Sequence, residues 1–333
     1  MKRITIVGIG AVGAFVAARL ALAGAAPHAI ARGATLAAIR EHGLTLREGG
    51  TTQQVAIDAS DDARALGVQD LVIVAVKAQA LAALVPTLAP LIGRHTIVLP
   101  AMNGVPWWFL QTPAMASHFP GTAGHLQSVD PGGTIGAALA LPQVLGCVVH
   151  FTCSSPAPGV ALHGFGDRLI VGEPAGGASA RSDAVAELLR GAGFTVEASG
   201  DIRRDIWFKL WGNMTTNPIS ALTGATVDRI LDDPQVYDLM LQAMAEAREI
   251  GARIGCPIEQ SGEDRMVVTR SLGAFKTSML QDAEAGRPLE LDALVGAVYE
   301  IGARVGVATP AIGALRGWTR LMARGRGLYP AAV

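Results

Sequence analysis

The sequence Ile4-Thr5-Ile6-Val7-Gly8-Ile9-Gly10-Ala11-Val12-Gly13 decides the fold of the first half of this chain. It begins as a short apolar strand, and a helix-prone run follows it from Ala14 to Leu22. A strand, a G-x-G-x-x-G turn and a helix in this order are typical of a dinucleotide-binding unit. We therefore expect a cofactor pyrophosphate to lie against backbone N–H groups of the turn, at the positive end of the helix.

The three glycines of the turn have different roles in such a unit. Gly8 permits the tight turn, Gly10 lets the backbone approach the pyrophosphate, and Gly13 lets the helix pack close to the strand. The expected cofactor-binding residues of the turn are Gly8, Ile9, Gly10, Ala11, Val12 and Gly13. A glycine-rich turn without a ligand is the alternative, and the flanking strand and helix argue against it.

Arg32 indicates which dinucleotide is bound. In an NAD site, an Asp or Glu about twenty residues beyond the turn binds the ribose 2′-OH. Here the second apolar segment, Ala29-Ile30-Ala31, ends in Arg32-Gly33 with no acidic residue nearby. An arginine at this place suits a 2′-phosphate, so the sequence favours NADPH as the cofactor.

Composition excludes several classes of function. The chain has 333 residues, of which 17% are charged, and its net charge is −1, so we expect no nucleic-acid or membrane partner. Cys147, Cys153 and Cys256 lack the spacing of a metal site and suit buried positions in a reducing compartment, so no metal is expected. We find no signal peptide and no apolar run long enough to span a bilayer, and we expect a cytoplasmic protein.

The pattern of the chain predicts two domains. Strand-like and helix-like segments alternate in the first half, which predicts an α/β, Rossmann-like, NADP-binding domain over residues 1–198. Within it, we expect 144–153 and 168–171 to be strands added antiparallel to the sheet edge. Helical periodicity then predicts an all-α substrate or dimerisation domain over residues 199–333. Its predicted helices are 202–217, 232–254, 261–272, 290–305 and 310–323, and the tail from Gly325 to Val333 is expected to be loosely held.

Lys209 is the strongest candidate for acid–base chemistry. On a helix, Lys209, Asn213 and Asn217 occur at i, i+4 and i+8 and share one face, among apolar and aromatic neighbours. Such a lysine can protonate an alkoxide that forms on a reduced carbonyl, and the two amides can bind substrate oxygens. A lysine that extends to solvent from an amphipathic helix is the alternative.

Two further polar residues follow strand-like runs. Lys77 directly follows Leu71–Val76, and Asn103 lies in the loop after the strand that ends at Pro100. Because ligands bind at the carboxyl ends of parallel strands, both side chains are candidates for cofactor binding. A solvated lysine and a turn-forming asparagine are the alternatives.

Over nearly its whole length the chain resembles the ketopantoate reductases, also called 2-dehydropantoate 2-reductases. The resemblance is carried by the glycine turn together with Arg32-Gly33, Val76-Lys77, Asn103-Gly104, Lys209-x-x-x-Asn213-x-x-x-Asn217-Pro218, Ser278-Met279-Leu280-Gln281-Asp282 and Glu290-x-Asp292. It implies NADPH-dependent reduction of 2-dehydropantoate to (R)-pantoate, a step toward pantothenate and coenzyme A. It also implies a Rossmann-like domain and a helical domain with the active site in the cleft between them.

The same resemblance implies a role for each matching residue. Lys209 is then the general acid, and the substrate is bound by Asn213, Asn217, Ser278 and Glu290. Glu290 also belongs to the nicotinamide-ribose end of the site. Arg32 and Lys77 attend the adenosine 2′-phosphate, and Asn103 attends the nicotinamide ribose or the substrate.

The chain departs from the family pattern at two places. Some members have Asn three residues before the substrate-binding serine, where this chain has Phe275. One polar contact is therefore either missing or replaced, with Lys276 and Thr277 as the candidates to replace it. Trp107 and Trp108 follow the Asn103 loop and could reshape the pocket.

Two other functions therefore stay open: reduction of another branched 2-oxo acid, and a non-catalytic NADP(H) sensor whose helical domain binds a partner. The joint presence of Lys209, both asparagines, Ser278 and Glu290 argues against the sensor, which needs none of them. An apolar helical domain is also often the contact surface of a homodimer.

Overall fold

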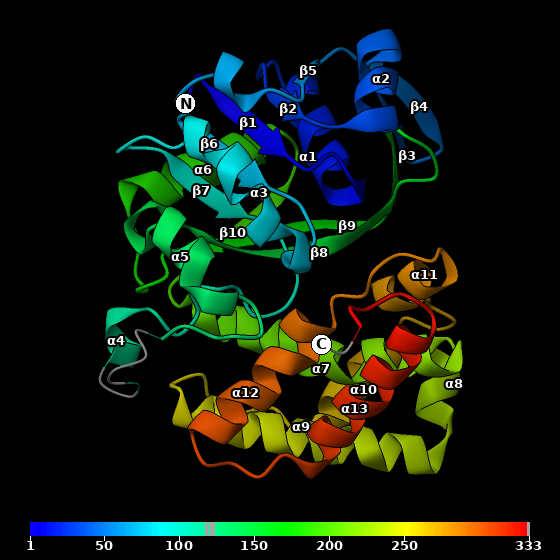
Figure 1. Cartoon of the computed structure of the whole chain (residues 1–333). Coiled ribbons are helices and arrows are strands. Elements are labelled where there is room, and N and C mark those ends of the chain that lie inside the picture. Colours follow the sequence, from blue (N-terminus) through cyan, green and yellow to red (C-terminus); the bar gives the residue numbers. More distant parts are fainter. Residues whose placement is uncertain (117–118, 120–123, 332–333) are drawn as a thin grey trace. The chain divides into compact units, whose positions relative to one another are not determined.

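The computed structural model describes residues 1–116, 119 and 124–331, which form two compact units (Figure 1). The first unit consists of Met1–Met102, Gln111–Ala114 and Gly133–Asp205. The helical unit consists of Asn103–Leu110, Met115–Gly132 and Ile206–Val333. The chain thus passes into the helical unit near residue 206, whereas the sequence placed this boundary at 198/199. The chain also contributes two segments from within its first 198 residues to the helical unit, namely Asn103–Leu110 and Met115–Gly132.

The core of the first unit is a parallel sheet with the strand order β5-β2-β1-β6-β7. Its strands are β1 (Ile4–Val7), β2 (His28–Ile30), β5 (Asp58–Ser60), β6 (Leu71–Val74) and β7 (Ile97–Pro100). Every residue of β1, β6 and β7 is buried, as expected for central strands that are covered on both faces. The expected Rossmann-like α/β fold is confirmed.

Helices connect and cover these strands. The helices of the first unit are α1 (Ala11–Leu22), α2 (Gly33–His42), α3 (Leu81–Leu88), α5 (Thr134–Ala138) and α6 (Ala180–Gly191), and the short α4 (Pro113–Ala116) crosses from one unit to the other. Pro86 lies inside α3 without ending it.

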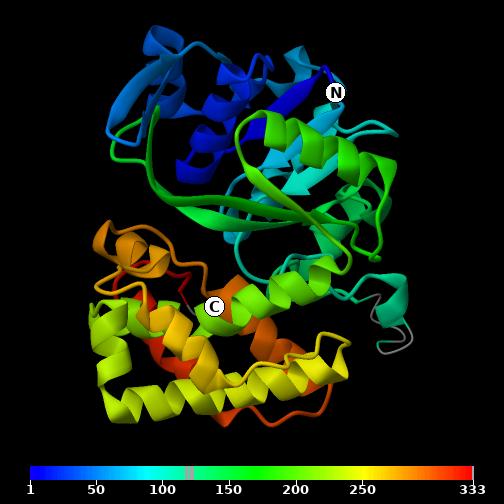
Figure 2. The same ribbon diagram turned by 180° about the vertical axis from the view of Figure 1, so that it is seen from behind.

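A second sheet packs on the far side of α1, with the order β10-β9-β3-β4 and β8 paired to β9. Its strands are β3 (Leu44–Glu48), β4 (Thr51–Val55), β8 (Gly146–Ser154), β9 (Val160–Gly172) and β10 (Thr195–Ser199). The long β8–β9 hairpin is the pair of long green strands in Figure 2. The two predicted strands are present within β8 and β9, which pair antiparallel with each other. The expectation that they are added antiparallel to the edge of the parallel sheet is wrong, because both belong to this second sheet, in which β9 is parallel to β3 and β10. Val144, just before β8, forms a single bridge with Val98 of β7, and that bridge is parallel.

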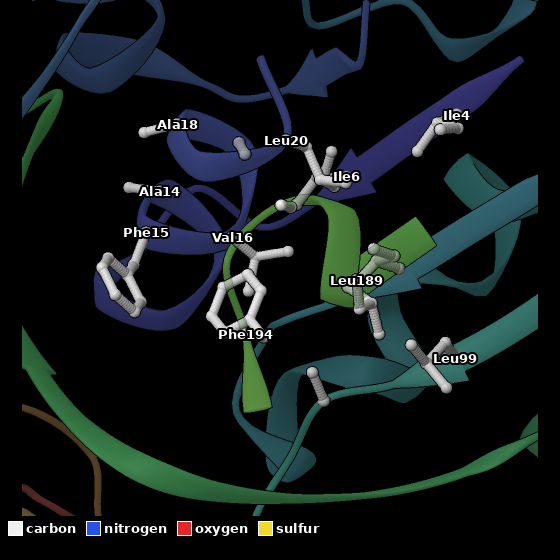
Figure 3. Close-up of a cluster of buried hydrophobic side chains, with 14 of the residues drawn as sticks. Ile4, Ile6, Ala14, Phe15, Val16, Ala18, Leu20, Leu99, Leu189 and Phe194 are labelled. Atoms are coloured by element: carbon white, nitrogen blue, oxygen red, sulfur yellow. The ribbon is translucent and has the colours of Figure 1, made fainter. Parts of the chain in front are cut away.

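The position of α1 between the two sheets explains its apolar sequence. A helix that is hydrophobic on all sides needs burial on all sides. Phe15, Val16 and Leu20 are at most 2% exposed. Figure 3 shows side chains of α1 together with Ile6 from β1, Leu189 from α6 and Phe194, which precedes β10.

The helical unit is built around α7 and α9. Its helices are α7 (Ile202–Thr223), which begins in the first unit, and α8 (Val227–Asp232), α9 (Pro234–Arg253), α10 (Gly262–Arg270), α11 (Ser278–Glu284), η6 (Asp292–Gly296), α12 (Ala297–Arg304) and α13 (Pro310–Gly325). Among the helices of the described residues, none combines the length and the apolar composition that a bilayer crossing requires.

Two buried tryptophans fix α7 against α9. The indole N–H groups of Trp207 and Trp211 donate to the carbonyls of Ala247 (3.2 Å) and Met244 (2.7 Å). Gly251 is needed at this contact, since a Cβ there would lie 2.4 Å from Nε1 of Trp207. With one side of α7 held by α9 in this way, Lys209 and the two asparagines occupy another side of the same helix.

The segment that follows Asn103 belongs to the core of the helical unit. Trp107, Trp108 and Phe109 are at most 1% exposed, and Phe109 stacks on Trp207 with ring centroids 5.9 Å apart. The expectation that Trp107 and Trp108 reshape a pocket is therefore replaced by a packing role.

The segment at Gln127 and Ser128 is hydrogen-bonded to α12 through the carboxylate of Glu300. Glu300 accepts hydrogen bonds from the backbone N–H groups of Gln127 and Ser128, each at 2.9 Å, and from the Ser128 hydroxyl. Arg304 pairs with the same carboxylate. Burial alone would raise the pKa of Glu300, but these hydrogen bonds outweigh burial and hold the pKa below its usual value.

The described part of the C-terminal tail is attached, which corrects the expectation of a loose tail. Leu328 is 3% exposed, and its carbonyl accepts the N–H of Leu289 at 3.0 Å. The Tyr329 hydroxyl lies 2.8 Å from each carboxylate oxygen of Asp292. These contacts could not be read from the sequence, because they join segments about forty residues apart.

Candidate active site

The glycine turn has the geometry that a dinucleotide requires. Gly8 has φ +93°, and a Cβ there would lie 2.4 Å from a methyl group of Val76. A Cβ on Gly13 would lie 2.0 Å from the carbonyl oxygen of Gly8, so the helix can approach the strand only without a side chain. Around Gly10, by contrast, there is open space where a Cβ would be, which is where a pyrophosphate can approach the backbone.

A cavity of about 340 Å³ opens beside this turn. Its lining residues are Val7, Gly8, Ile9, Ile30, Ala31, Arg32, Thr35, Val76, Ala80, Ala83 and Leu84. They come from the carboxyl ends of β1 and β2, from α2, from the segment after β6, and from α3, as expected for a ligand site of a parallel sheet. The apolar lining suits a nucleoside, and Arg32 is the charged residue among the described lining residues. The residues present therefore fit the adenosine end of a dinucleotide.

Arg32 and Lys77 lie at this cavity in different ways. Arg32 is exposed and donates a hydrogen bond from Nη2 to the Thr87 hydroxyl (3.0 Å), which fixes its guanidinium at the cavity. Lys77 is half-buried and lies between the lining residue Val76 and the turn that carries Ala80. Arg32 thus lines the cavity itself, and Lys77 directly follows the lining residue Val76 in the chain.

The structure brings Lys209 and Asn103 together in the helical unit. The Lys209 ammonium donates to Oδ1 of Asn103 at 2.8 Å, although 106 residues separate the two in the sequence. Lys209 is half-buried on α7, beside the fully buried Leu210. A hydrogen bond from a charged donor fixes the direction in which the ammonium points. The ammonium of a solvated lysine has no such fixed direction.

Asn213 and Asn217 lie one and two turns beyond Lys209 on the same face of α7. Asn217 is 5% exposed. Within the described residues, neither side-chain amide takes part in a hydrogen bond. Because buried amides in proteins normally have partners, an amide at this position is typical of a ligand contact.

The loop at Asn103 is held by a π-helical turn, η6. The N–H of Ala297 donates to the carbonyl of Asp292, five residues back, and the carbonyl of Ala293 accepts the N–H of Val105 at 2.8 Å. Gly104 lies directly on Ala293, with φ +83° and room for no side chain. Sequence reasoning missed these roles of Gly104 and η6, and the Asn-Gly pair, which marks a tight turn, was the available signal. Glu290 precedes η6 by two residues.

Ser278 is exposed at the first position of α11, whose preceding residue Thr277 caps the helix by accepting the N–H of Leu280. Lys276 pairs with Glu284 at 2.7 Å. In this structure both Thr277 and Lys276, the two candidates to replace the missing asparagine contact at Phe275, already have a partner. The Phe275 carbonyl accepts the N–H of Val227, which fixes the backbone at this position.

Comparisons with known proteins identify the family of this chain. The family model "Ketopantoate reductase PanE/ApbA" matches residues 4–176, and "Ketopantoate reductase PanE/ApbA C terminal" matches residues 201–322. A 2-dehydropantoate 2-reductase from Mesorhizobium japonicum is 42% identical over 98% of this chain and 99% of its own. A crystal structure from Ralstonia solanacearum MolK2, assigned provisionally as a ketopantoate reductase, is 59% identical, with a TM-score of 0.94 over 98% of this chain and 99% of its own.

A more distant structure shares the fold. D-mandelate dehydrogenase with NADH and anilino(oxo)acetate has a TM-score of 0.83 at 18% identity, over 98% of this chain and 99% of that one. At this identity the likeness concerns the fold alone. The family models cover both units, and the Mesorhizobium relative covers nearly the full length. The chain belongs to the ketopantoate reductase family of oxidoreductases.

Proposed function

We propose that this protein reduces 2-dehydropantoate to (R)-pantoate with NADPH, in the synthesis of pantothenate. The name of the Mesorhizobium relative supports the substrate, and the Arg32 cavity supports the phosphorylated cofactor. The observation that carries the proposal is the hydrogen bond of 2.8 Å from Lys209 to Asn103, because it gives a half-buried ammonium a fixed direction.

The residues of the first unit would hold the cofactor. When bound, NADPH supplies a hydride to the carbonyl carbon of the substrate. The N–H groups of the Gly8–Gly13 turn, which includes Ile9, Ala11 and Val12, would bind the pyrophosphate. Arg32 and Lys77 would neutralise the adenosine 2′-phosphate, which carries negative charge that an NAD ribose lacks.

The residues of the helical unit would bind the 2-oxo acid and handle the proton. Lys209 would donate its proton to the C2 oxygen, so that the carbonyl becomes the hydroxyl of the product. Asn213, Asn217 and Ser278 would orient the substrate oxygens, and Glu290 would bind the substrate or the nicotinamide ribose. Asn103 would keep the Lys209 ammonium in place and contact the same ribose or the substrate.

A panel of 2-oxo acids with NADPH and with NADH tests this proposal. We expect 2-dehydropantoate to give the highest kcat/KM, measured by the absorbance of the reduced nicotinamide. Arg32→Ala should raise the KM for NADPH by about tenfold or more and leave that for NADH nearly unchanged. Equal losses for both cofactors would contradict a 2′-phosphate contact.

A second candidate is the reduction of another branched 2-oxo acid. Phe275 favours it, because an apolar ring stands where some family members have an amide, and both Lys276 and Thr277 are engaged elsewhere. An apolar residue there suits a substrate with a less polar side chain. The same panel separates the two candidates.

We also propose that the helical unit forms a homodimer. The exposed Trp318 (56%) and Leu321 (73%) lie one turn apart on α13, and a dimeric ketopantoate reductase from Staphylococcus aureus shares the fold at 21% identity. Sedimentation of the wild type and of Leu321→Glu tests this, with a monomeric wild type as the contradicting result.

A further inference from the structure

We propose that Tyr329 and the π-helical turn η6 are positioning elements for the proton donor, acting through Gly104 and Asn103. This inference rests on the proposed function of Lys209. It concerns a chain of contacts within the helical unit that connects the C-terminal tail to the Lys209 ammonium.

The first link joins the tail to the start of η6. The Tyr329 hydroxyl lies 2.8 Å from both carboxylate oxygens of Asp292, the first residue of the turn. Burial, together with the hydrogen bond to Asp292, raises the pKa of Tyr329 to about 12, so the phenol keeps the proton that it donates. The bond between Leu289 and Leu328 holds the tail at a second point.

The second link depends on the π-helical geometry. In an α-helix the N–H of Ala297 would bind the carbonyl of Ala293, but here it binds that of Asp292. The Ala293 carbonyl accepts the N–H of Val105 instead, at 2.8 Å. Asp292 thus contributes its side chain to Tyr329 and its carbonyl to the turn that presents Ala293.

The third link is a close backbone contact. A Cβ on Gly104 would lie 2.5 Å from the carbonyl oxygen and 2.8 Å from the Cβ of Ala293. The backbone at Gly104 therefore lies directly against Ala293 of η6, and a displacement of η6 displaces the loop with it. Asn103 is the adjacent residue.

The last link is the hydrogen bond from Lys209 to Oδ1 of Asn103. Since η6 holds the Gly104–Val105 backbone next to Asn103, and α7 carries Lys209, the direction of the ammonium depends on both elements. Misplacement of a catalytic group by about 1 Å can cost about 10²-fold in rate. Loss of the Tyr329 hydroxyl therefore slows the proton-transfer step, although Tyr329 touches no reacting atom.

Tyr329→Phe tests the first link, with Tyr237→Phe as a matched control. Both variants lose one phenol oxygen from the helical unit, but in the described structure the Tyr237 hydroxyl makes no hydrogen bond. We expect Tyr329→Phe to lower kcat by about fivefold, with the Kd for NADPH unchanged, and to increase the solvent deuterium isotope effect on kcat. Tyr237→Phe should leave kcat, the Kd for NADPH and the solvent isotope effect at their wild-type values.

Gly104→Ala tests the third link, with Gly224→Ala as its control. Both glycines have positive φ, +83° and +71°, but a Cβ on Gly224 would meet no atom within 4 Å. We expect about a 10²-fold loss of kcat for Gly104→Ala and little change for Gly224→Ala. If Gly104→Ala fails to fold, the Tyr329 variants still decide the question.

A double-mutant cycle shows whether the effects share one path. Asn103→Ala breaks the chain at its last link, so adding Tyr329→Phe to it should cost little more than Asn103→Ala alone. Multiplicative losses, or a Tyr329→Phe enzyme with an unchanged isotope effect, would overturn the inference. If Lys209→Met retains wild-type turnover, the proposed function fails together with this inference. If Lys209→Met is inactive while Tyr329→Phe and Gly104→Ala turn over at the wild-type rate, only this inference fails.

Discussion

Replacement of Lys209 by methionine removes the ammonium and keeps the length of an apolar side chain. General acid catalysis contributes about 10²- to 10⁴-fold to a rate, which corresponds to about 2.7–5.4 kcal/mol of barrier. The same change removes the hydrogen bond of 2.8 Å to Oδ1 of Asn103. A hydrogen bond to a charged group contributes about 1.5–3 kcal/mol to the stability of the folded state, which is separate from the effect on the barrier. We therefore expect Lys209→Met to lower kcat by at least about 10²-fold.

The assay separates chemistry from cofactor binding. The cavity at Arg32 is lined by residues of the first unit, so the Kd for NADPH, measured by fluorescence titration, should change by less than about twofold. Lys2→Met is the control, because it removes an exposed lysine at the N-terminus. A Lys209→Met enzyme that is as well folded as the control and turns over at close to the wild-type rate would refute the role of Lys209.

Three other predictions follow from single contacts. Gly13→Ala should abolish NADPH binding, measured by the same titration, because its Cβ would lie 2.0 Å from the Gly8 carbonyl oxygen; binding at wild-type affinity would show that the turn can open. Glu300→Gln should lower the free energy of unfolding in urea by about 1–3 kcal/mol at neutral pH. Because the pKa of Glu300 is lowered in the folded state, its stabilisation is present above the ordinary pKa and is lost as the pH falls through the folded-state pKa. The free energies of unfolding of the wild type and the variant should therefore converge in acid, and a difference that stays constant with pH would contradict this. Phe275→Asn should increase kcat/KM for 2-dehydropantoate relative to less polar 2-oxo acids, and an unchanged ratio in the substrate panel would remove Phe275 from specificity.

The sequence was most informative where function restricts the residue type. The packing roles of Gly8 and Gly13 could be predicted because only glycine lets the strand, the turn and the helix come this close together. The structure agrees, since a Cβ on either residue would lie within 2.4 Å of a neighbouring atom. The face shared by Lys209, Asn213 and Asn217 followed from helical periodicity, which does not depend on the rest of the fold. Their roles in binding and catalysis stay predictions.

Contacts between distant segments could not be predicted in the same way. The hydrogen bonds from Lys209 to Asn103 and from Tyr329 to Asp292 depend on how distant segments pack, and a single sequence carries no signal for that packing. The second sheet was misassigned for a related reason: alternation identifies a strand such as β8 but does not identify the partner beside it. The aromatic run at 107–109 was ambiguous, because apolar residues suit both a pocket wall and a core.

The assignment of Asn103–Leu110 to the helical unit has a practical consequence for dissecting this enzyme. A fragment cut at residue 198 would keep Trp107, Trp108 and Phe109 but lose the helices that enclose them. Such a fragment would expose a continuous aromatic surface, which promotes aggregation. Expression trials of an isolated cofactor-binding half should therefore replace these three side chains with polar ones, or retain the whole polypeptide.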